Sequence, residues 1–161
     1  MSSSESQPLD IRTSAVRAAV RESRVFSSLH DAEIDEIVNV SEVSRVATGE
    51  VVCRPGDPGD HVAMVVSGCL AAEAPGLCRI TPLNQIGPGE IFGEMAVLRG
   101  ARRSAQVTAL EPTELLVICQ AVFLSLLVRH PAISIRVLGS VSDRLHHLTE
   151  ALGEDLAAVT L

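Results

Sequence analysis

The middle of the chain, from Val43 to Cys119, alternates short apolar runs rich in β-branched residues with turns rich in glycine and proline. Runs of this length are typical of strands, since a helix needs about ten residues or more to bury one face. The turn signals lie at residues 48–49, 54–60, 74–76 and 87–90. They divide the region into eight expected strands, near residues 43–47, 50–53, 62–66, 69–73, 78–80, 83–86, 105–110 and 114–119. Short strands at this spacing predict an eight-stranded antiparallel β-barrel or jelly roll of the double-stranded β-helix type.

Helical patterns precede the strand-rich region. Alanines and spaced aliphatic residues predict a helix over about 10–24, and a second, shorter helix is expected over 31–40. In the second helix Asp31 can cap the first amides, and apolar residues recur at helical spacing at positions 34, 37 and 38. The polar residues 1–9 are expected to be disordered.

Helical patterns also follow the strands. A helix is expected over about 120–130 and ends at His130, because a residue before proline avoids the helical conformation. Pro131 suits the first turn of a longer helix over 132–152, for which Gly153 is the expected end. One apolar stripe runs along this last helix and is formed by Ile135, Leu138, Val141, Leu145, Leu148 and Leu152.

The predicted fold class is therefore α+β, and a chain of 161 residues is expected to form one domain. Hydrophobic residues make up 47% of the chain, which is enough to build a buried core. The expected segments are a disordered N-terminus at 1–9, N-terminal helices at 10–42, the β-barrel at 43–119, two C-terminal helices at 120–153 and a tail at 154–161.

Residues 91–107, with the sequence IFGEMAVLRGARRSAQV, do not follow the strand pattern around them. Positions 94–98 suit a single helical turn, and Gly93 lies where that turn would begin. A glycine at this place leaves the backbone amides open to an anion. The segment therefore predicts an anion-binding loop within the strand-rich region.

The polar residues of this segment fit a nucleotide that carries one negative charge. Arg103 has a planar guanidinium that can bind a phosphate through two hydrogen bonds, and Ser104 and the amide of Ala105 are adjacent donors. Glu94 is a poor phosphate ligand, but its carboxylate can accept hydrogen bonds from ribose hydroxyls.

The segment resembles the phosphate-binding cassette of the cyclic nucleotide-binding domain family, the sensor module of catabolite-activator-type regulators, protein-kinase-A regulatory subunits and gated channels. That cassette usually reads F-G-E followed by apolar residues and, after a variable stretch, P-R-[A/S/T]-A; here it reads FGEMAVL over 92–98 and RRSA over 102–105. A second family signature, glycine–aspartate turns followed by strands and a further glycine, is matched at 49–52, 56–57, 59–60 and 65–68. Together the two signatures extend the resemblance over about residues 20–152.

The resemblance implies a role for each cassette residue. Glu94 would bind the ribose 2′-hydroxyl and Arg103 the cyclic phosphate, while the cradle would be completed by Gly93, Met95, Ala96, Ser104 and Ala105. The last helix would close over the base as a lid, with a hinge near 119–131, and its candidate base contacts are Arg144, His147 and Leu148. The ligand is expected to be cAMP rather than cGMP, because a lysine-free chain rich in alanine, valine and arginine is typical of bacteria.

Three positions depart from the family pattern. Arg102 replaces the common proline, Gln106 replaces a small hydroxyl residue, and Ala63 replaces a usual aromatic residue. With Arg99 and Arg103, Arg102 places three positive charges within five residues of a chain whose net charge is −7. None of these changes removes an expected ligand group. The alternative is a degenerate domain that no longer binds nucleotide and serves as a protein-interaction or dimerisation module.

Composition argues against several other classes of protein. A net charge of −7 does not suit a broad nucleic-acid or anionic-membrane surface, and three phenylalanines as the only aromatic residues offer no stacking platform. No run approaches the roughly 18 uncharged apolar residues of a membrane span, and the polar, acidic N-terminus does not resemble a signal peptide. A cytoplasmic location is therefore expected.

Neither a catalytic nor a metal site is expected. The barrel contains one histidine, His61, so the metal-binding histidines of a cupin enzyme are missing, and no G-x-S-x-G motif is present. The four cysteines, at positions 53, 69, 78 and 119, form no CxxC pair, and the adjacent His146 and His147 point about 100° apart on a helix. The expected classification is a non-enzymatic sensor without a cofactor.

The expected partner is a small-molecule cyclic nucleotide. The apolar stripe along 132–152 fits either lid packing or the seam of a homodimer, and both interpretations stay open. Nine residues follow Leu152, too few for a helix-turn-helix, so no DNA binding by this chain is expected and its effector would lie outside it.

Overall fold

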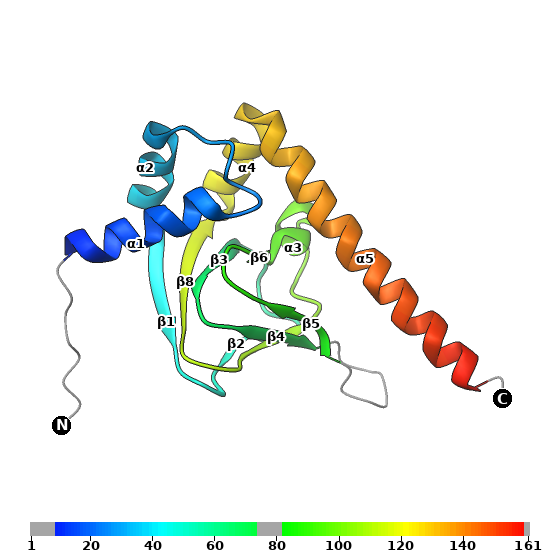
Figure 1. Ribbon diagram of the computed structural model, residues 1–161. Coiled ribbons are helices and arrows are strands. Elements are labelled where there is room, and N and C mark those ends of the chain that lie inside the picture. The colour runs from blue at the N-terminus through cyan, green and yellow to red at the C-terminus, as the bar shows by residue number, and fades with distance from the viewer. Residues whose placement is uncertain (1–8, 74–81, 160–161) are drawn as a thin grey trace, which may run out of the picture.

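The computed structural model describes residues 9–73 and 82–159 (Figure 1). Two helices precede the strands, α1 (Leu9–Glu22) and α2 (Asp31–Val40), and two follow them, α4 (Gln120–Arg129) and α5 (Pro131–Val159). A short helix, α3 (Glu94–Arg99), interrupts the strands. The strands are β1 (Glu42–Val46), β2 (Val51–Cys53), β3 (His61–Ser67), β4 (Leu70–Glu73), β5 (Pro82–Ile86), β6 (Ile91–Phe92), β7 (Gln106–Ala109) and β8 (Thr113–Cys119).

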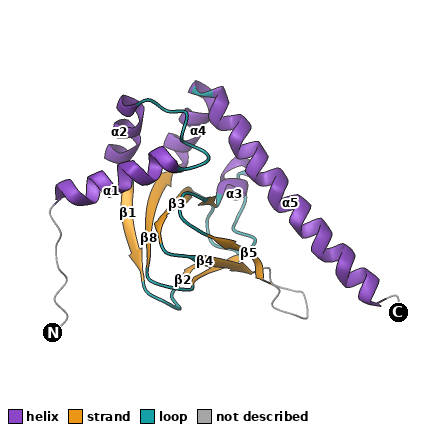
Figure 2. Ribbon diagram, viewed as in Figure 1, coloured by secondary structure: helices purple, strands orange, loops and turns teal. Residues whose placement is uncertain are grey.

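The described strands form two antiparallel sheets of four strands each, in the orders β1-β8-β3-β6 and β2-β7-β4-β5 (Figure 2). Neighbours within a sheet are mostly not consecutive in the chain, which is the pattern of a jelly roll. The predicted α+β class with an antiparallel jelly roll is confirmed, with two four-stranded sheets in place of one closed barrel. The strand expected at 78–80 lies outside the described residues, and the two-residue β6 is not predicted by the sequence pattern.

Strand β3 is buried on both faces and separates two hydrophobic cores. Val62 and Met64 belong to a core shared with the helices, whereas Ala63 and Val65 belong to a core between the two sheets. Successive side chains of a strand point to opposite faces, so a strand covered on both sides reads as a continuous apolar run. This burial explains why residues 62–66 are all apolar.

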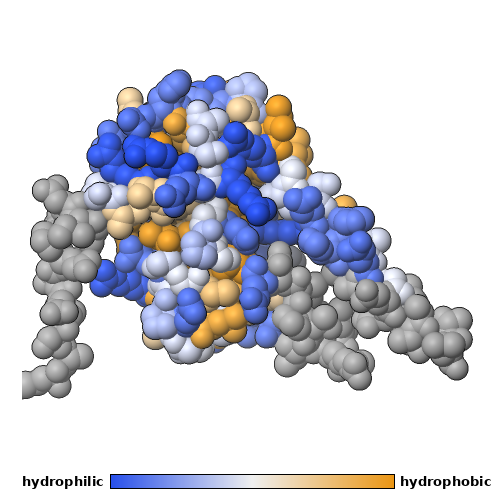
Figure 3. All heavy atoms as spheres, viewed as in Figure 1, coloured by the Kyte–Doolittle hydropathy of each residue, from blue (hydrophilic) through white to orange (hydrophobic). Residues whose placement is uncertain are grey.

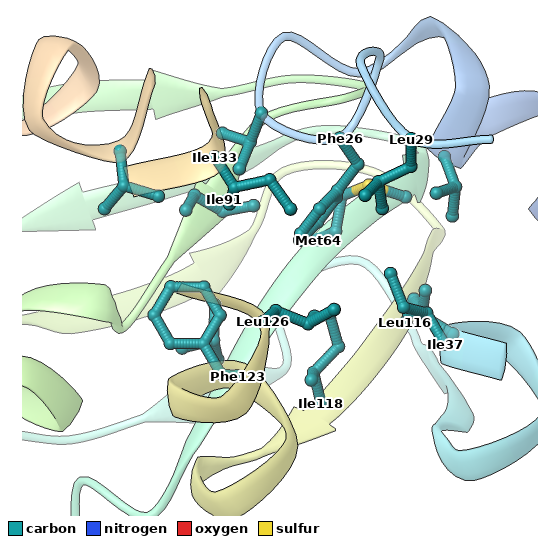
Figure 4. Packing of buried hydrophobic residues seen from close by; sticks show 14 of the residues in the cluster. Phe26, Leu29, Ile37, Met64, Ile91, Leu116, Ile118, Phe123, Leu126 and Ile133 are labelled. Carbon is teal, nitrogen blue, oxygen red and sulfur yellow. The ribbon is translucent and has the colours of Figure 1, made fainter. Parts of the chain in front are cut away.

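The helices pack on the outer face of the sheet that contains β3. Figure 4 shows Phe123 and Leu126 of α4 beside Ile118, and Phe26, from the segment after α1, near Met64. Both phenylalanines are fully buried. Phe123 therefore fixes α4, and Phe26 the turn after α1, to the sheet through the burial of a large apolar side chain, a contribution of about 1.5–3 kcal/mol per residue.

Helix α5 is longer than the sequence pattern predicts. It begins at Pro131, as predicted, but it does not end at Gly153 and continues to Val159, through most of the expected tail. A glycine ends a helix when its backbone turns left-handed, and Gly153 is not among the glycines with positive φ. No proline follows it in the chain, so the helical conformation continues.

Helices α4 and α5 meet at a bend of 113°, with the single residue His130 between them. Within the described residues, no single helix is long and apolar enough to cross a membrane, and α4 with the first part of α5 reaches that length only as this bent pair. Beyond the bend α5 presents Ile135, Leu138 and Leu145, which are 69, 65 and 62% exposed. Figure 3 shows apolar surface on the part of α5 next to α4.

Candidate functional site

A cavity of about 250 Å³ lies between the loop that contains α3 and helix α5. All of the cassette residues predicted from the sequence line it: Gly93, Glu94, Met95, Ala96, Arg103, Ser104 and Ala105. Val141, Arg144 and Leu145 of α5 form the opposite side. The structure therefore brings the predicted residues together around one space that suits a small molecule.

The three lid residues suggested by the sequence have different positions. Arg144 lines the cavity, whereas His147 does not and is 68% exposed beside Glu150 of its own helix. The side chain of Leu148 lies outside the described part of the chain. Leu145 also lines the cavity, and the sequence indicates it only as a member of the apolar stripe.

Gly93 begins α3 in a conformation that other residues avoid. Its φ is 89°, and a Cβ at this position would overlap with the guanidinium of Arg103 and lie 3.1 Å from the carbonyl oxygen of His61. The close approach lets Arg103 Nη1 donate a hydrogen bond to the Gly93 carbonyl oxygen at 3.1 Å. The glycine of the cassette is thus required both by the backbone and by the arginine ten residues later.

The guanidinium of Arg103 is buried and held in place by backbone carbonyls. The residue is 6% exposed, and its Nη2 donates to the His61 carbonyl oxygen at 2.6 Å. Its backbone is fixed as well, because its amide donates to the Asp57 carbonyl oxygen at 2.9 Å and its carbonyl accepts from the Gly56 amide at 2.8 Å. In the described part of the chain no carboxylate pairs with Arg103, and its Nε has no hydrogen-bond partner. A buried positive charge without a counter-ion is costly, and an anion in the cavity would supply one.

Glu94 is fully buried and shared between the cassette and α5. Arg144 Nη1 donates to Glu94 Oε1 at 2.5 Å, and Arg144 Nη2 donates to the Ile91 carbonyl oxygen. The other oxygen, Oε2, is buried without a hydrogen bond from any described group. Arg144 therefore compensates the buried charge and connects α5 to the cassette, while one carboxylate oxygen stays available as an acceptor.

The rest of the cavity wall is apolar. It is formed by Ala72, Ile86, Phe92, Val107, Val141 and Leu145, together with Cys53. Burial raises the pKa of the Cys53 thiol, and the charge of Arg103 opposes this shift only in part. The thiol is therefore neutral at pH 7 and acts as part of the apolar wall.

The other two arginines of the cassette lie outside the cavity. Arg102 is exposed and its Nη1 donates to the Gly56 carbonyl oxygen at 2.8 Å, so it braces a neighbouring turn in the place of the usual proline. Arg99 is exposed at the end of α3. Of the three clustered positive charges, only that of Arg103 reaches the cavity.

Comparison with known proteins agrees with this geometry. Residues 43–130, more than half of the chain, match the family model described as the cyclic nucleotide-binding domain. A cyclic nucleotide-gated potassium channel of Mesorhizobium japonicum is 37% identical over 110 residues, which cover 68% of this chain and 29% of the channel. The chain thus spans less than a third of the length of this curated relative.

Solved structures show the same fold. The catabolite activator protein of Thermus thermophilus superimposes with a TM-score of 0.70 and 30% identity over 84% of this chain and 63% of that protein. The cAMP-bound structure of PfPKA-R superimposes with a TM-score of 0.64 and 25% identity over 74% of this chain and 43% of that one.

Proposed function

Because the chain belongs to the cyclic nucleotide-binding domain family, we propose that its cavity binds a 3′,5′-cyclic nucleotide between the cassette and α5. One observation carries the proposal: Arg103 Nε and Glu94 Oε2 are both buried, both unpartnered, and belong to side chains that line one cavity. A cyclic phosphate supplies the anion that the arginine lacks, and a ribose 2′-hydroxyl supplies the donor that the glutamate lacks. The cradle is completed by Gly93, Met95, Ala96, Ser104 and Ala105.

The preferred nucleotide in this proposal is cAMP, with cGMP bound more weakly. Guanine carries an additional exocyclic group on its hydrogen-bonding edge, and polar groups are costly to bury without partners. Beyond the phosphate and ribose positions, the described wall offers mainly aliphatic side chains, with Ser104 and Arg144 as the polar exceptions. The similarity to the cAMP-bound PfPKA-R structure supports the same preference.

We further propose that nucleotide binding is transmitted through α5. The carboxylate of Glu94 connects the two, since Oε1 is bound to Arg144 and Oε2 faces no described partner. A ligand that fills the cavity contacts cassette and α5 together and so favours the state in which α5 lies over the site. Movement would take place around 119–131, where α4 and α5 meet at the 113° bend.

The proposed role is that of a sensor without catalytic activity of its own, acting on an effector outside this chain and not on DNA. The similarity does not identify the effector, because the match covers 29% of the channel relative. The exposed apolar residues Ile135, Leu138 and Leu145 lie along one helix and support a homodimer through 132–152 as a further part of the proposal. Sedimentation velocity on the full chain decides between monomer and dimer.

Thermal unfolding with added ligand tests the binding proposal. At a cAMP concentration of 100 times Kd, we expect Tm to rise by about 5–10 °C, with a smaller rise for cGMP at the same concentration. The matched control is 5′-AMP, which has the same base and sugar but no cyclic phosphate and should give little change. No rise with either cyclic nucleotide at millimolar concentration would contradict binding and favour the degenerate interaction module.

A further inference from the structure

Strand β2 is flanked by two turns of the same construction, a first turn at 47–50 with the sequence ATGE and a second turn at 54–57 with the sequence RPGD. The third residue of each is a glycine in the left-handed conformation, with a φ of 82° for Gly49 and 89° for Gly56. The amide of the fourth residue donates to the carbonyl oxygen of the first, at 3.0 Å in the first turn and 3.1 Å in the second. The two turns therefore share one backbone arrangement.

The carboxylate of the last residue closes each turn. Glu50 Oε2 accepts a hydrogen bond from the Ala47 amide at 2.9 Å. Asp57 Oδ2 accepts one from the Arg54 amide at 2.8 Å. A side-chain oxygen that accepts from a nearby amide holds a turn in one conformation, and it does so as an acceptor and not as a charge.

The first turn holds the last residue of β7. The Gly49 amide donates to the Ala109 carbonyl oxygen at 2.7 Å, and the Ala109 amide donates to the Glu50 carbonyl oxygen at 3.0 Å. This pair of backbone hydrogen bonds fixes a residue of the sheet that does not line the cavity.

The second turn holds Arg103 by the same pair of hydrogen bonds. The Gly56 amide donates to the Arg103 carbonyl oxygen at 2.8 Å, and the Arg103 amide donates to the Asp57 carbonyl oxygen at 2.9 Å. Arg102 donates to this turn from outside, and the turn keeps its own internal bonds without that side chain. One arrangement thus serves the sheet at the first turn and the cassette arginine at the second.

The chain just after the second turn also lies against α3. A Cβ at Gly59 would lie 2.4 Å from the Ala101 carbonyl oxygen and 2.6 Å from the Cβ of Ala96. Ala96 belongs to α3 and lines the cavity. The segment that begins with the second turn is therefore in close contact with the cassette at two places, Arg103 and α3.

We propose that Asp57 is a positioning residue for Arg103. Its carboxylate fixes the second turn, and the turn fixes the backbone from which the guanidinium reaches the cavity. Asp57 is exposed and does not line the cavity, so its effect on a ligand passes through the turn. As far as it concerns nucleotide affinity, the proposal rests on the proposed function: an arginine that takes several positions meets the phosphate for only part of the time, and the apparent affinity falls with that fraction.

Hydrogen exchange without nucleotide tests the positioning. The exchange of the Arg103 and Ala109 amides is measured in the wild type, Asp57→Ala and Glu50→Ala, the last being the matched control. We expect Asp57→Ala to speed exchange at Arg103 by about 2- to 10-fold and to leave Ala109 unchanged, and Glu50→Ala to do the reverse, because each change removes one hydrogen bond from one turn. Equal exchange at Arg103 in Asp57→Ala and the wild type would overturn the proposal.

Titration with cAMP tests the consequence for the site. Asp57→Ala is expected to lower affinity by about 2- to 10-fold and Glu50→Ala to leave it unchanged. Asp57→Asn should retain the wild-type affinity, because its amide oxygen accepts the same hydrogen bond. In an Arg103→Ala background, Asp57→Ala should cost no further affinity.

Two results of the titrations would overturn the proposal. An equal loss of affinity in Asp57→Ala and Glu50→Ala would show a general loosening of the domain, and a further loss in the Arg103→Ala background would show that Asp57 acts through another residue. If the wild type binds no cyclic nucleotide, the proposed function fails, and amide exchange at Arg103 still decides whether Asp57 positions it.

Discussion

Three of the four carboxylates of helix α2 pair with arginines, whereas Glu94 and Arg103, the two buried charges of the cassette, each keep one polar atom without a hydrogen-bond partner. The α2 pairs lie mostly at the surface, where water also satisfies the charges. The cassette charges lie inside, where an unpartnered polar atom costs about 1–3 kcal/mol. The carboxylates of α2 therefore serve to attach neighbouring helices. In the cassette, each of the two charged side chains keeps an unpartnered polar atom, which costs free energy of folding. The difference supports the ligand-binding role proposed above for the cassette charges.

The largest effect is expected from removing the cation of the cassette, Arg103. Arg103→Ala is expected to lower cAMP affinity by about 30- to 1,000-fold, because a charge-assisted contact to the phosphate contributes about 2–4 kcal/mol. Isothermal titration calorimetry measures the change. Arg102→Ala is the matched control, since this neighbouring arginine is exposed and braces the Gly56 turn outside the cavity.

An equal affinity of Arg103→Ala and the wild type would place the phosphate elsewhere. Because the guanidinium also holds the carbonyl groups of Gly93 and His61, circular dichroism should first establish that the variant folds. Arg103→Lys supplies a second variant that keeps the charge but loses the planar fork, and an intermediate affinity is expected for it.

A change at Glu94 should have a smaller and more selective effect. We expect the wild type to prefer cAMP to 2′-deoxy-cAMP by about 10- to 150-fold, the contribution of one hydrogen bond to a charged group, and Glu94→Gln to reduce that preference to about twofold. Parallel titrations of both nucleotides measure the preference. Glu90→Gln is the control, because Glu90 is close in the chain but does not line this cavity. A preference that survives in Glu94→Gln would remove this residue from the ribose site.

A change on α2 should have the smallest effect. Asp31→Asn removes an exposed ion pair with Arg21, so we expect a loss of about 1 kcal/mol or less, a Tm shift of at most about 2–4 °C, and no change in nucleotide affinity. Thermal unfolding and a cAMP titration of the same sample measure both. If Asp31→Asn lost as much nucleotide affinity as Glu94→Gln, the charges of α2 would not be restricted to attaching helices.

The sequence predicts the contiguous parts of the molecule well. The helix over 31–40 is found at those residues, and the run at 62–66 lies within β3, because each depends on local periodicity. The cassette residues also come together as predicted, because positions 93–105 are close in the chain and line one cavity. The two-residue β6 has no periodicity to detect, and its pairing with β3 depends on the rest of the sheet.

The contribution of α5 to the site is harder to predict. The sequence offers Arg144 only as one of three candidate lid residues, because its pairing with Glu94 joins residues 50 positions apart. The apolar stripe includes Val141 and Leu145, which line the cavity, but which part of the stripe lies over the cassette depends on the 113° bend at His130, a tertiary feature. For that reason Leu145 lines the cavity and His147 does not.

The length of α5 gives the bend at His130 a mechanical consequence. A straight helix of 29 residues is about 43 Å long at about 1.5 Å per residue. A rotation of about 10° at its first turn would carry its far end through about 7 Å, on the order of the diameter of a helix. Contact changes of about an ångström at Arg144, nearly halfway along this lever arm, are thus about doubled at Val159.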